Sequence, residues 1–520
     1  MIKFFDPKNK HFKPVYPVLL LFFLMLSVAW YKWIILGGYA APPGSDGGQW
    51  LAFGHQFFTG ETVKAGFQSY PPLLPSIVKI ASTVLTPLEA LKVTGIFTSV
   101  FIAIPVYLIL RRTLIPVIAI ALAITATLTP FNSEVLSFGG YPQLLGSSFL
   151  LFSLYFLTLG FETRGKRWFF AASLAASATI GSNVFPSFLL IIASLLIVLF
   201  YLFRMGCESK AILYHRIRSA FLCWVLPSIV LVIPFIKSYF AYLSESASSE
   251  ATTMHWRVIE ITGWVNSSWL FEFTLWFVVA SIMGALLILL GKTFFNKQII
   301  LASTSISLLI ATILGVFVIP ELRFVGFIEI SLILVLGFLP GIVKSLVNHL
   351  KVQKYFVRVM LIFTLACILT VGTLGYRRLL IASDWYQVVT PPVIGALDWL
   401  SDNGDLGSIV VTTGTERGHV YGWWIEGYSH LPAYTAGDPL LFFSEEERTQ
   451  VEIAQNILID DTSSSEIEAL VEQHQIRYLF LDKNIMETSH YKLVRAGFKD
   501  QFENQTILIM ENTNLNDNTQ

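Results

Sequence analysis

Three glycines flank a single carboxylate early in the chain, where Gly44, Gly47 and Gly48 surround Asp46. Glycines let the backbone turn tightly and leave the carboxylate uncrowded. A carboxylate in this setting can act as a general base that accepts the proton of a substrate hydroxyl. Aspartate before a helical run is also a common N-cap, so Asp46 could instead cap a helix that begins near Gly48. The two roles are compatible.

A second isolated carboxylate, Glu134, lies in the segment 130–140, which has no other charged residue. Between two apolar spans, such a group can face a polar cavity and bind an acceptor or a divalent metal ion. Ordinary solvation in a loop is the alternative. Two acids so far apart in the sequence are too few to predict a metal cage, so a Mg²⁺ or Mn²⁺ site remains an open alternative.

Residues 49–58, which follow Asp46, alternate apolar and polar groups at helical spacing. This pattern predicts a helix that lies in a membrane interface. His55 in this helix could contact phosphate or substrate, or it could serve only as a hydrogen-bonding group at the interface.

The elements that position these residues follow from the composition of the chain. Of its 520 residues, 54% are hydrophobic and only 13% are charged. This balance excludes an ordinary soluble protein and predicts a polytopic α-helical membrane protein. The sequence contains no nucleotide fingerprint, P-loop or zinc-ligand spacing, and we expect no nucleic-acid partner.

Apolar stretches predict about eleven membrane crossings. They lie near residues 15–37, 89–110, 114–130, 141–161, 168–182, 185–203, 219–238, 270–290, 299–319, 324–343 and 356–375.

Basic residues predict the orientation of these crossings. Lys and Arg collect in the N-terminal segment and in alternate loops, at 111–112, 164–167, 204–218, 292–297 and 344–354. By the positive-inside rule these loops are cytoplasmic, and the loops at 38–88, 131–140, 239–269 and 320–323 face outward. The apolar segment 71–86 must then be interfacial or re-entrant, because counting it as a span would invert every later loop.

The chain divides into a membrane domain and a smaller polar domain. Residues 1–375 form the transmembrane domain, with a large first outer loop at 38–88. Residues 376–511 alternate predicted helices and strands, which indicates an extracytoplasmic α/β domain. Residues 512–520 are polar and are predicted to be disordered.

This arrangement resembles the GT-C superfamily of membrane glycosyltransferases. In that superfamily an acidic residue follows the first helix, a Tyr-Pro-Pro-Leu-like element lies further along the same outer loop, and a second acid lies in the next outer loop. Asp46, the element Tyr70-Pro71-Pro72-Leu73 and Glu134 stand at these positions. The resemblance covers the architecture of nearly the whole chain.

The segment Gly422-Trp-Trp-Ile-Glu-Gly427 is similar to the Trp-Trp-Asp region of oligosaccharyltransferase catalytic subunits. Ile425 stands where that motif has its aspartate, and Glu426 comes one place later. Trp423, Trp424 and Glu426 could line an acceptor cleft. Alternatively, the two tryptophans could only dock the polar domain onto the membrane domain.

The resemblance implies transfer of a sugar from a polyprenyl-phosphate donor to a glycan, lipid or protein acceptor at the outer face. Asp46 would be the base, and an outward cation would neutralise the departing lipid phosphate. Arg323 is the best placed cation in the sequence, with Arg257 and His255 as second choices. A local ion pair or contact with lipid headgroups is the alternative for Arg323.

Two other functions stay open on the sequence alone. One is a transporter or flippase for lipid-linked glycans, and the other is a non-catalytic scaffold with the same fold. In each case we expect an integral protein of a prokaryotic plasma membrane, with a cytoplasmic N-terminus and the polar domain outside.

Overall fold

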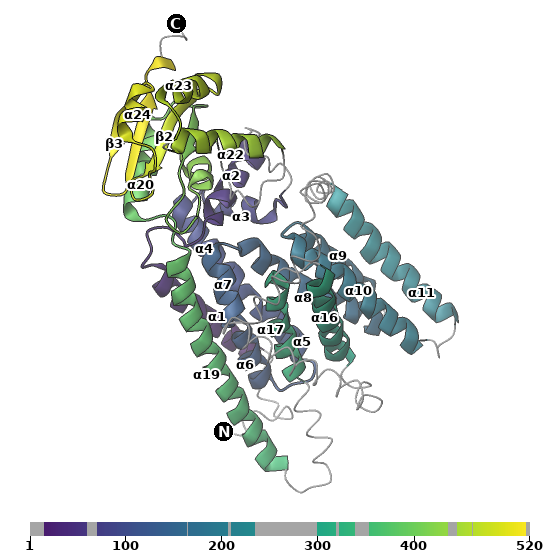
Figure 1. The fold of residues 1–520 in the computed structure, drawn as a ribbon. Coiled ribbons are helices and arrows are strands. Elements are labelled where there is room, and N and C mark those ends of the chain that lie inside the picture. Colours follow the sequence, from purple (N-terminus) through teal and green to yellow (C-terminus); the bar gives the residue numbers. More distant parts are fainter. Residues whose placement is uncertain are drawn as a thin grey trace.

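The computed structural model describes residues 15–59, 70–163, 165–205, 210–233, 299–318, 322–337, 353–434, 445–459 and 461–515. Helices make up the part before residue 386, and a sheet with flanking helices makes up most of the remainder (Figure 1). The predicted span at 270–290, His255 and Arg257 lie outside the described residues, as does the end of the tail at 516–520.

The helical part comprises α1 (Val15–Leu36), α2 (Asp46–Thr59), α3 (Leu73–Ala81), α4 (Pro87–Phe101), α5 (Ala103–Leu110), α6 (Pro116–Thr127), α7 (Pro130–Phe138), α8 (Tyr141–Thr163), α9 (Lys166–Ile180), α10 (Val184–Met205), α11 (Lys210–Ala220), a π-helical turn (Phe221–Val225), α16 (Ile299–Val318), α17 (Leu322–Leu336) and α19 (Gln353–Trp385).

Six helical stretches in the described residues are long and apolar enough to cross a membrane, namely Val15–Leu36, Pro87–Leu110, Pro116–Phe138, Tyr141–Thr163, Val184–Leu202 and Tyr214–Ile233. The prediction of a polytopic helical membrane protein is therefore confirmed. The count of about eleven crossings stays a prediction.

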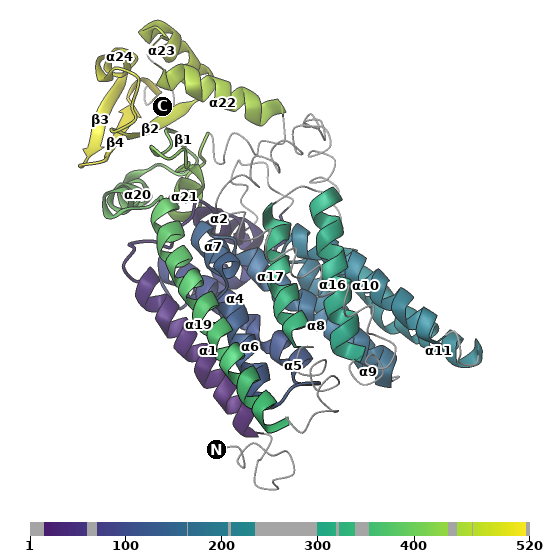
Figure 2. The same ribbon diagram turned by 60° about the horizontal axis from the view of Figure 1, so that its bottom comes forward.

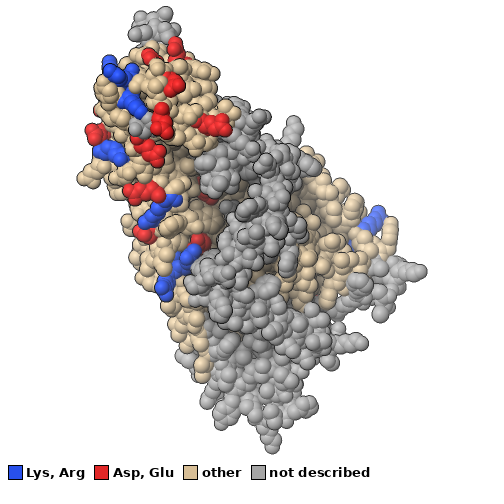
Figure 3. Space-filling model, viewed as in Figure 1, with Lys and Arg blue, Asp and Glu red and all other residues tan. Residues whose placement is uncertain are grey.

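Large apolar side chains of α1 point away from the rest of the protein. Phe22, Phe23 and Trp30 are 58%, 63% and 66% exposed, whereas Leu21 and Met25 on the opposite side are buried. Such exposure is costly in water but favourable against lipid tails. On the face in Figure 3, Lys, Arg, Asp and Glu gather over the C-terminal region, and the described helical surface is mostly uncharged.

The segment predicted to be interfacial forms α3, which has only nine residues. At about 1.5 Å per residue it is too short to cross a hydrocarbon core of about 30 Å. α3 packs against α2 and α4, near the C-terminal region (Figure 1). The start of α1 lies at the opposite end of the helical part.

The C-terminal region contains α20 (Pro391–Asn403), β1 (Ile409–Thr412), α21 (Gly422–Trp424), a π-helical turn (Ile425–Ser429), α22 (Glu445–Leu458), α23 (Ser464–Gln473), β2 (Ile476–Asp482), α24 (His490–Arg495), β3 (Phe498–Glu503) and β4 (Ile507–Asn512).

The four strands form a mixed sheet in the order β1-β2-β4-β3 (Figure 2). β1 and β2 are parallel, and β4 is antiparallel to both of its neighbours. The helix α19 continues through residue 376, where the composition changes, and ends at Trp385. Residue 512, where the predicted tail begins, is still the last residue of β4.

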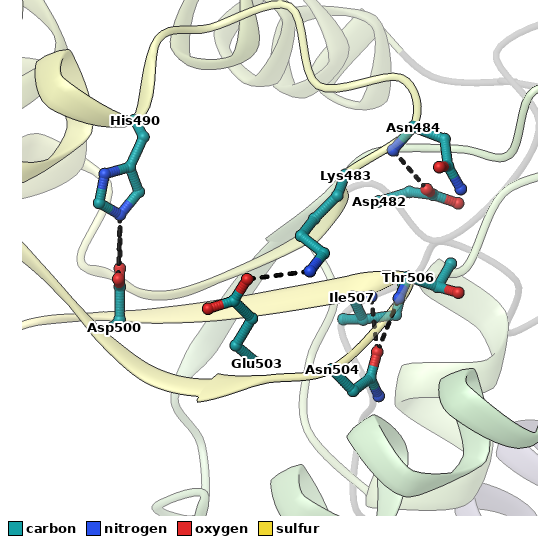
Figure 4. Close-up of polar contacts among 9 residues, drawn as sticks. All are labelled: Asp482, Lys483, Asn484, His490, Asp500, Glu503, Asn504, Thr506 and Ile507. Carbon is teal, nitrogen blue, oxygen red and sulfur yellow. Dashed lines mark hydrogen bonds and ion pairs between the residues drawn. The ribbon is translucent and has the colours of Figure 1, made fainter.

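The sequence did not predict β3, because this edge strand is charged and exposed. Edge strands commonly carry such charges, which discourage pairing with other chains. Figure 4 shows how the edge is held: Asp500 pairs with His490 at 2.8 Å, and Lys483 pairs with Glu503 at 2.9 Å. The Asn504 side chain closes the turn into β4 by accepting hydrogen bonds from the backbone N–H groups of residues 506 and 507.

Candidate active site

The candidate base Asp46 is the first residue of α2 and is half-buried. The loop before it is fixed by Gly44, whose N–H donates to the Tyr386 carbonyl at 2.7 Å. Gly44 has a φ of +102°, and a Cβ there would lie 2.3 Å from the Phe138 carbonyl oxygen. Only glycine fits so close to the end of α7.

The first turn of α2 packs against the end of α7. Trp50 donates its indole N–H to the Gly139 carbonyl at 2.7 Å. A Cβ on Gly139, which ends α7 with a φ of +91°, would lie 3.0 Å from the Asp46 Cβ. The Asp46 carboxylate therefore lies at a helix N-terminus, where the macrodipole favours an anion. This is close to the capping position that the sequence suggested, and it leaves the general-base hypothesis untested.

The second candidate acid, Glu134, lies within α7 rather than in an irregular loop. Its carboxylate pairs with the Nε of Arg378 on α19 and accepts a hydrogen bond from the Tyr386 hydroxyl at 3.1 Å. Ordinary loop solvation is thus not its environment, because the Glu134 side chain is only 14% exposed. The structure brings together one acid and one arginine at the end of α7.

Tyr386 links the two candidate acids. Its carbonyl holds Gly44, two residues before Asp46, and its hydroxyl holds Glu134. Its ring lies 5.9 Å from the Phe138 ring and 5.8 Å from the His419 ring of the C-terminal region. Tyr386 therefore connects α2, α7 and the C-terminal region at one point.

Sequence reasoning did not single out Arg378 or Tyr386. The sequence does contain a feature that could have identified the arginine. Arg377 and Arg378 follow the last predicted span at the end predicted to face outward, where the positive-inside rule expects few basic residues. A cation retained at an outward membrane face calls for a specific anionic partner. Arg323, the cation favoured by the sequence, is the second residue of α17.

His55 lies within α2, whereas Tyr70 lies before α3 and packs against α2. The Tyr70 ring packs 4.9 Å from Trp50, and its hydroxyl accepts a hydrogen bond from Asn183 at 3.0 Å. His55 is nine residues after Asp46, or about 13 Å along the helix. It stacks on His430 of the C-terminal region with ring centroids 4.1 Å apart. The structure places His55 at an interface between elements, and its substrate role stays a prediction.

The tryptophan pair lies between the C-terminal region and α2. Trp424 is fully buried and Trp423 is 6% exposed. A Cβ on Gly48 would lie 2.5 Å from the Trp423 backbone, and a Cβ on Gly427 would lie 2.1 Å from the Gly48 carbonyl oxygen. The two backbones are thus in direct contact, as the docking alternative expects. Acceptor binding by these residues stays a prediction.

Glu426 is completely buried behind this contact. One carboxyl oxygen accepts a hydrogen bond from the Ala433 N–H at 3.3 Å. The other oxygen has no hydrogen-bond partner in the part of the chain that the structure describes, nor does the indole N–H of Trp424. Burial raises the pKa of the Glu426 carboxyl well above its usual range. Burial therefore disfavours the ionised form of Glu426.

The described residues do not identify a ligand set for the divalent metal ion that the sequence left open. They contain no group of three or more His, Cys, Asp and Glu side chains that could hold a metal ion. Arg378 and Tyr386 contact both carboxylate oxygens of Glu134. Glu134 therefore already has a guanidinium and a hydroxyl as partners, and a divalent metal ion stays a prediction.

No known family model and no curated protein matches this sequence. Several solved structures have a similar fold. The apo oligosaccharyltransferase of Archaeoglobus fulgidus is 13% identical with a TM-score of 0.58, over 91% of this chain and 70% of that chain. The structure of the same protein in complex with zinc and sulfate is 12% identical with a TM-score of 0.58, over 94% of this chain and 73% of that chain. ArnT from Cupriavidus metallidurans in the apo state is 13% identical with a TM-score of 0.55, over 96% and 99%.

Proposed function

The chain has the fold of the GT-C membrane glycosyltransferases, and from this fold and the site at the ends of α2 and α7 we propose that it transfers a sugar from a polyprenyl-phosphate donor to an acceptor. The observation that carries the proposal is the pair of acids joined by Tyr386, with Arg378 beside the second acid. A structure of ArnT bound to undecaprenyl phosphate, at 12% identity and a TM-score of 0.50, supports a lipid-phosphate donor.

Asp46 is the proposed general base. It takes the proton of the acceptor hydroxyl while that oxygen forms a bond to the anomeric carbon of the sugar. The bond from this carbon to the phosphate oxygen breaks, and the lipid phosphate leaves with the electron pair. A half-buried carboxylate such as that of Asp46 suits proton transfer of this kind.

Arg378 is the proposed contact for the leaving phosphate. Its guanidinium carries five N–H donors, so it can hold Glu134 through Nε and still bind phosphate oxygens. Glu134 would orient the guanidinium. Arg323, the second residue of α17, remains a second candidate for the same role.

The proposed site faces the outside of the cell. The start of α1 and the C-terminal region lie at opposite ends of the helices (Figure 1), which supports a cytoplasmic N-terminus and an outer C-terminal region in a prokaryotic plasma membrane. The acceptor is a glycan, lipid or protein that reaches this end of the helices.

Transfer from radiolabelled polyprenyl-phosphate sugars to glycan, lipid and peptide acceptors tests the proposal, with purified protein in the presence of Mg²⁺ or Mn²⁺ and in the presence of a chelator. We expect transfer by the wild type and none by Asp46→Asn. The exposed Asp402 of α20 provides the matched control, and Asp402→Asn should keep full activity. Full activity of Asp46→Asn would show that Asp46 is not the general base. Lipid movement across vesicles without transfer would instead indicate a flippase.

A further inference from the structure

The helix that carries Glu134 begins at a break in the chain. α6 ends at Thr127 and α7 begins at Pro130. Proline has no backbone N–H and its ring prevents a helix from continuing through it. In an unbroken helix the carbonyl of Thr127 would accept a hydrogen bond from the N–H of Phe131, four residues later. At the break these two backbone groups bond to other partners.

Two side chains from other helices take the place of that missing bond. The Thr127 carbonyl accepts from the Lys32 ammonium of α1 at 2.8 Å. The Phe131 N–H donates to a carboxylate oxygen of Glu329 in α17 at 3.2 Å. Each half of the broken backbone pair therefore has a side-chain partner from a different helix.

A lysine at a helix C-terminus and a glutamate at a helix N-terminus are the side-chain types that suit these two ends. A helix C-terminus carries partial negative charge and favours a cation, whereas an N-terminus favours an anion. The side chain of Lys32, from α1, contacts the C-terminal end of α6. The side chain of Glu329, from α17, contacts the N-terminal end of α7. Buried backbone groups without partners are costly, so these two contacts should stabilise the break.

Lys32 also holds the first turn of α7 directly. It is 1% exposed and donates to the Asn132 side-chain carbonyl at 2.7 Å and to the Ser99 hydroxyl at 3.1 Å. The Asn132 amide in turn donates to the Ser99 carbonyl at 2.9 Å. α1, α4 and α7 are thus joined by one buried ammonium group.

α19 lies directly against the same break. A Cβ on Gly375 would lie 1.9 Å from the Leu128 carbonyl oxygen, so α19 approaches the backbone as closely as a glycine allows. Gly375 is three residues before Arg378, which pairs with Glu134. The position of α7 at this break therefore determines whether Glu134 contacts Arg378.

We infer that Lys32 and Glu329 are positioning residues, which fix α7 at the break and so hold Glu134 against Arg378. Their consequence for catalysis rests on the proposed function, whereas their effect on the position of α7 does not. Their hydrogen bonds go to the backbone and side chains around the break.

A disulfide between α7 and α19 measures this position without any substrate. The hydroxyl oxygens of Ser137 and Ser383 are 3.0 Å apart. The background protein has Cys207, Cys223 and Cys367 replaced by serine. A protein that also carries both Ser137→Cys and Ser383→Cys should form a disulfide between α7 and α19 rapidly.

Two substitutions of similar size then remove the partners of the break. Lys32→Met removes all three donated hydrogen bonds, and Glu329→Leu removes the acceptor for Phe131. In both we expect the disulfide to form several-fold more slowly. Glu329→Gln keeps a carbonyl acceptor and should restore the rate. Lys92→Met is the control, because Lys92 of α4 also donates to a backbone carbonyl, that of Tyr39, away from the break.

Sugar transfer gives the second measurement. A shift of about 1 Å at a catalytic group can lower kcat on the order of 100-fold, so Lys32→Met and Glu329→Leu should lower kcat with little change in KM. Unchanged disulfide rates in monodisperse Lys32→Met and Glu329→Leu would overturn the inference. Slower disulfide formation in a protein whose wild type transfers no sugar would keep the inference and reject the proposed function.

Discussion

Arg378 pairs with Glu134 across 244 positions of the sequence, and the two side chains are 27% and 14% exposed. Ion pairs in full contact with water contribute little to stability. This pair is largely shielded, so removing one partner leaves a poorly solvated charge. The pair is therefore a structural requirement of the site as well as a proposed part of its chemistry.

Glu134→Gln should lower sugar transfer on the order of 100-fold or more, because Arg378 loses the group that orients it. The stability loss should be about 1–3 kcal/mol. The control is Glu511→Gln in β4 of the C-terminal region, since Glu511 pairs with Arg477 at 2.6 Å with both side chains 16% exposed. The thermal unfolding temperature should fall in both variants, and by less in Glu511→Gln because Arg477 also pairs with Asp405 at 2.9 Å. Sugar transfer should fall only in Glu134→Gln. Equal transfer in the two variants would contradict the role of Glu134.

Tyr386→Phe tests the link between the acids. The substitution removes the hydrogen bond to Glu134 but keeps the ring and the carbonyl that holds Gly44. We expect about 1 kcal/mol of lost stability and a fall of about tenfold in kcat. Tyr428→Phe loses a comparable hydrogen bond to Asp398, at 2.7 Å in the C-terminal region, and should keep kcat. A kcat of Tyr386→Phe equal to that of the wild type would show that the hydroxyl is dispensable.

The apolar runs of the sequence predicted the helices of the membrane part well. The first predicted span, 15–37, matches α1 (Val15–Leu36), and the span 141–161 matches α8 (Tyr141–Thr163). Composition suffices here because each such helix must satisfy its own backbone in lipid. The short helix α7 was expected to be a loop, since nine residues around one acid show no long periodic pattern.

The contact partners of the site residues could not be predicted from the sequence. The contact between Gly44 and Tyr386 joins two segments that no local pattern relates. The same holds for Trp424 against Gly47, where a Cβ would lie 2.8 Å from the indole ring. Asp46 and Glu134 could be chosen as isolated acids, but only the fold shows that Tyr386 connects them.

Gly48→Ala tests the docking of the C-terminal region on α2. Its added Cβ would lie 2.5 Å from the Trp423 backbone, which cannot move aside as a side chain can. We expect a loss of about 1–3 kcal/mol and faster proteolysis of the C-terminal region. Gly395→Ala in α20 is the control, because a Cβ there meets no atom within 4 Å. It should gain about 0.5–1 kcal/mol from helix propensity. Equal proteolysis of the two variants would show that the contact does not hold the region.

The buried acid Glu426 predicts a pH dependence of stability. An unfolded glutamate ionises near pH 4.3, whereas burial keeps the folded Glu426 protonated to well above that pH. Between the two pKa values the folded state binds one proton more than the unfolded state. Stability from this group is therefore complete below the unfolded pKa and is lost as pH rises, by about 1.4 kcal/mol per pH unit, until the folded pKa is reached.

Glu426→Gln removes this titration with little change in shape. Gln keeps a carbonyl oxygen that can accept from the Ala433 N–H, which donates to Glu426 at 3.3 Å. The variant should be more stable than the wild type at pH 7, and the difference in thermal unfolding temperature should shrink as pH falls toward 4.3. Melting curves of both proteins at several pH values give this difference directly, and every other titrating group cancels between them. A difference that stays constant with pH would mean that Glu426 ionises in the folded protein as it does in the unfolded chain.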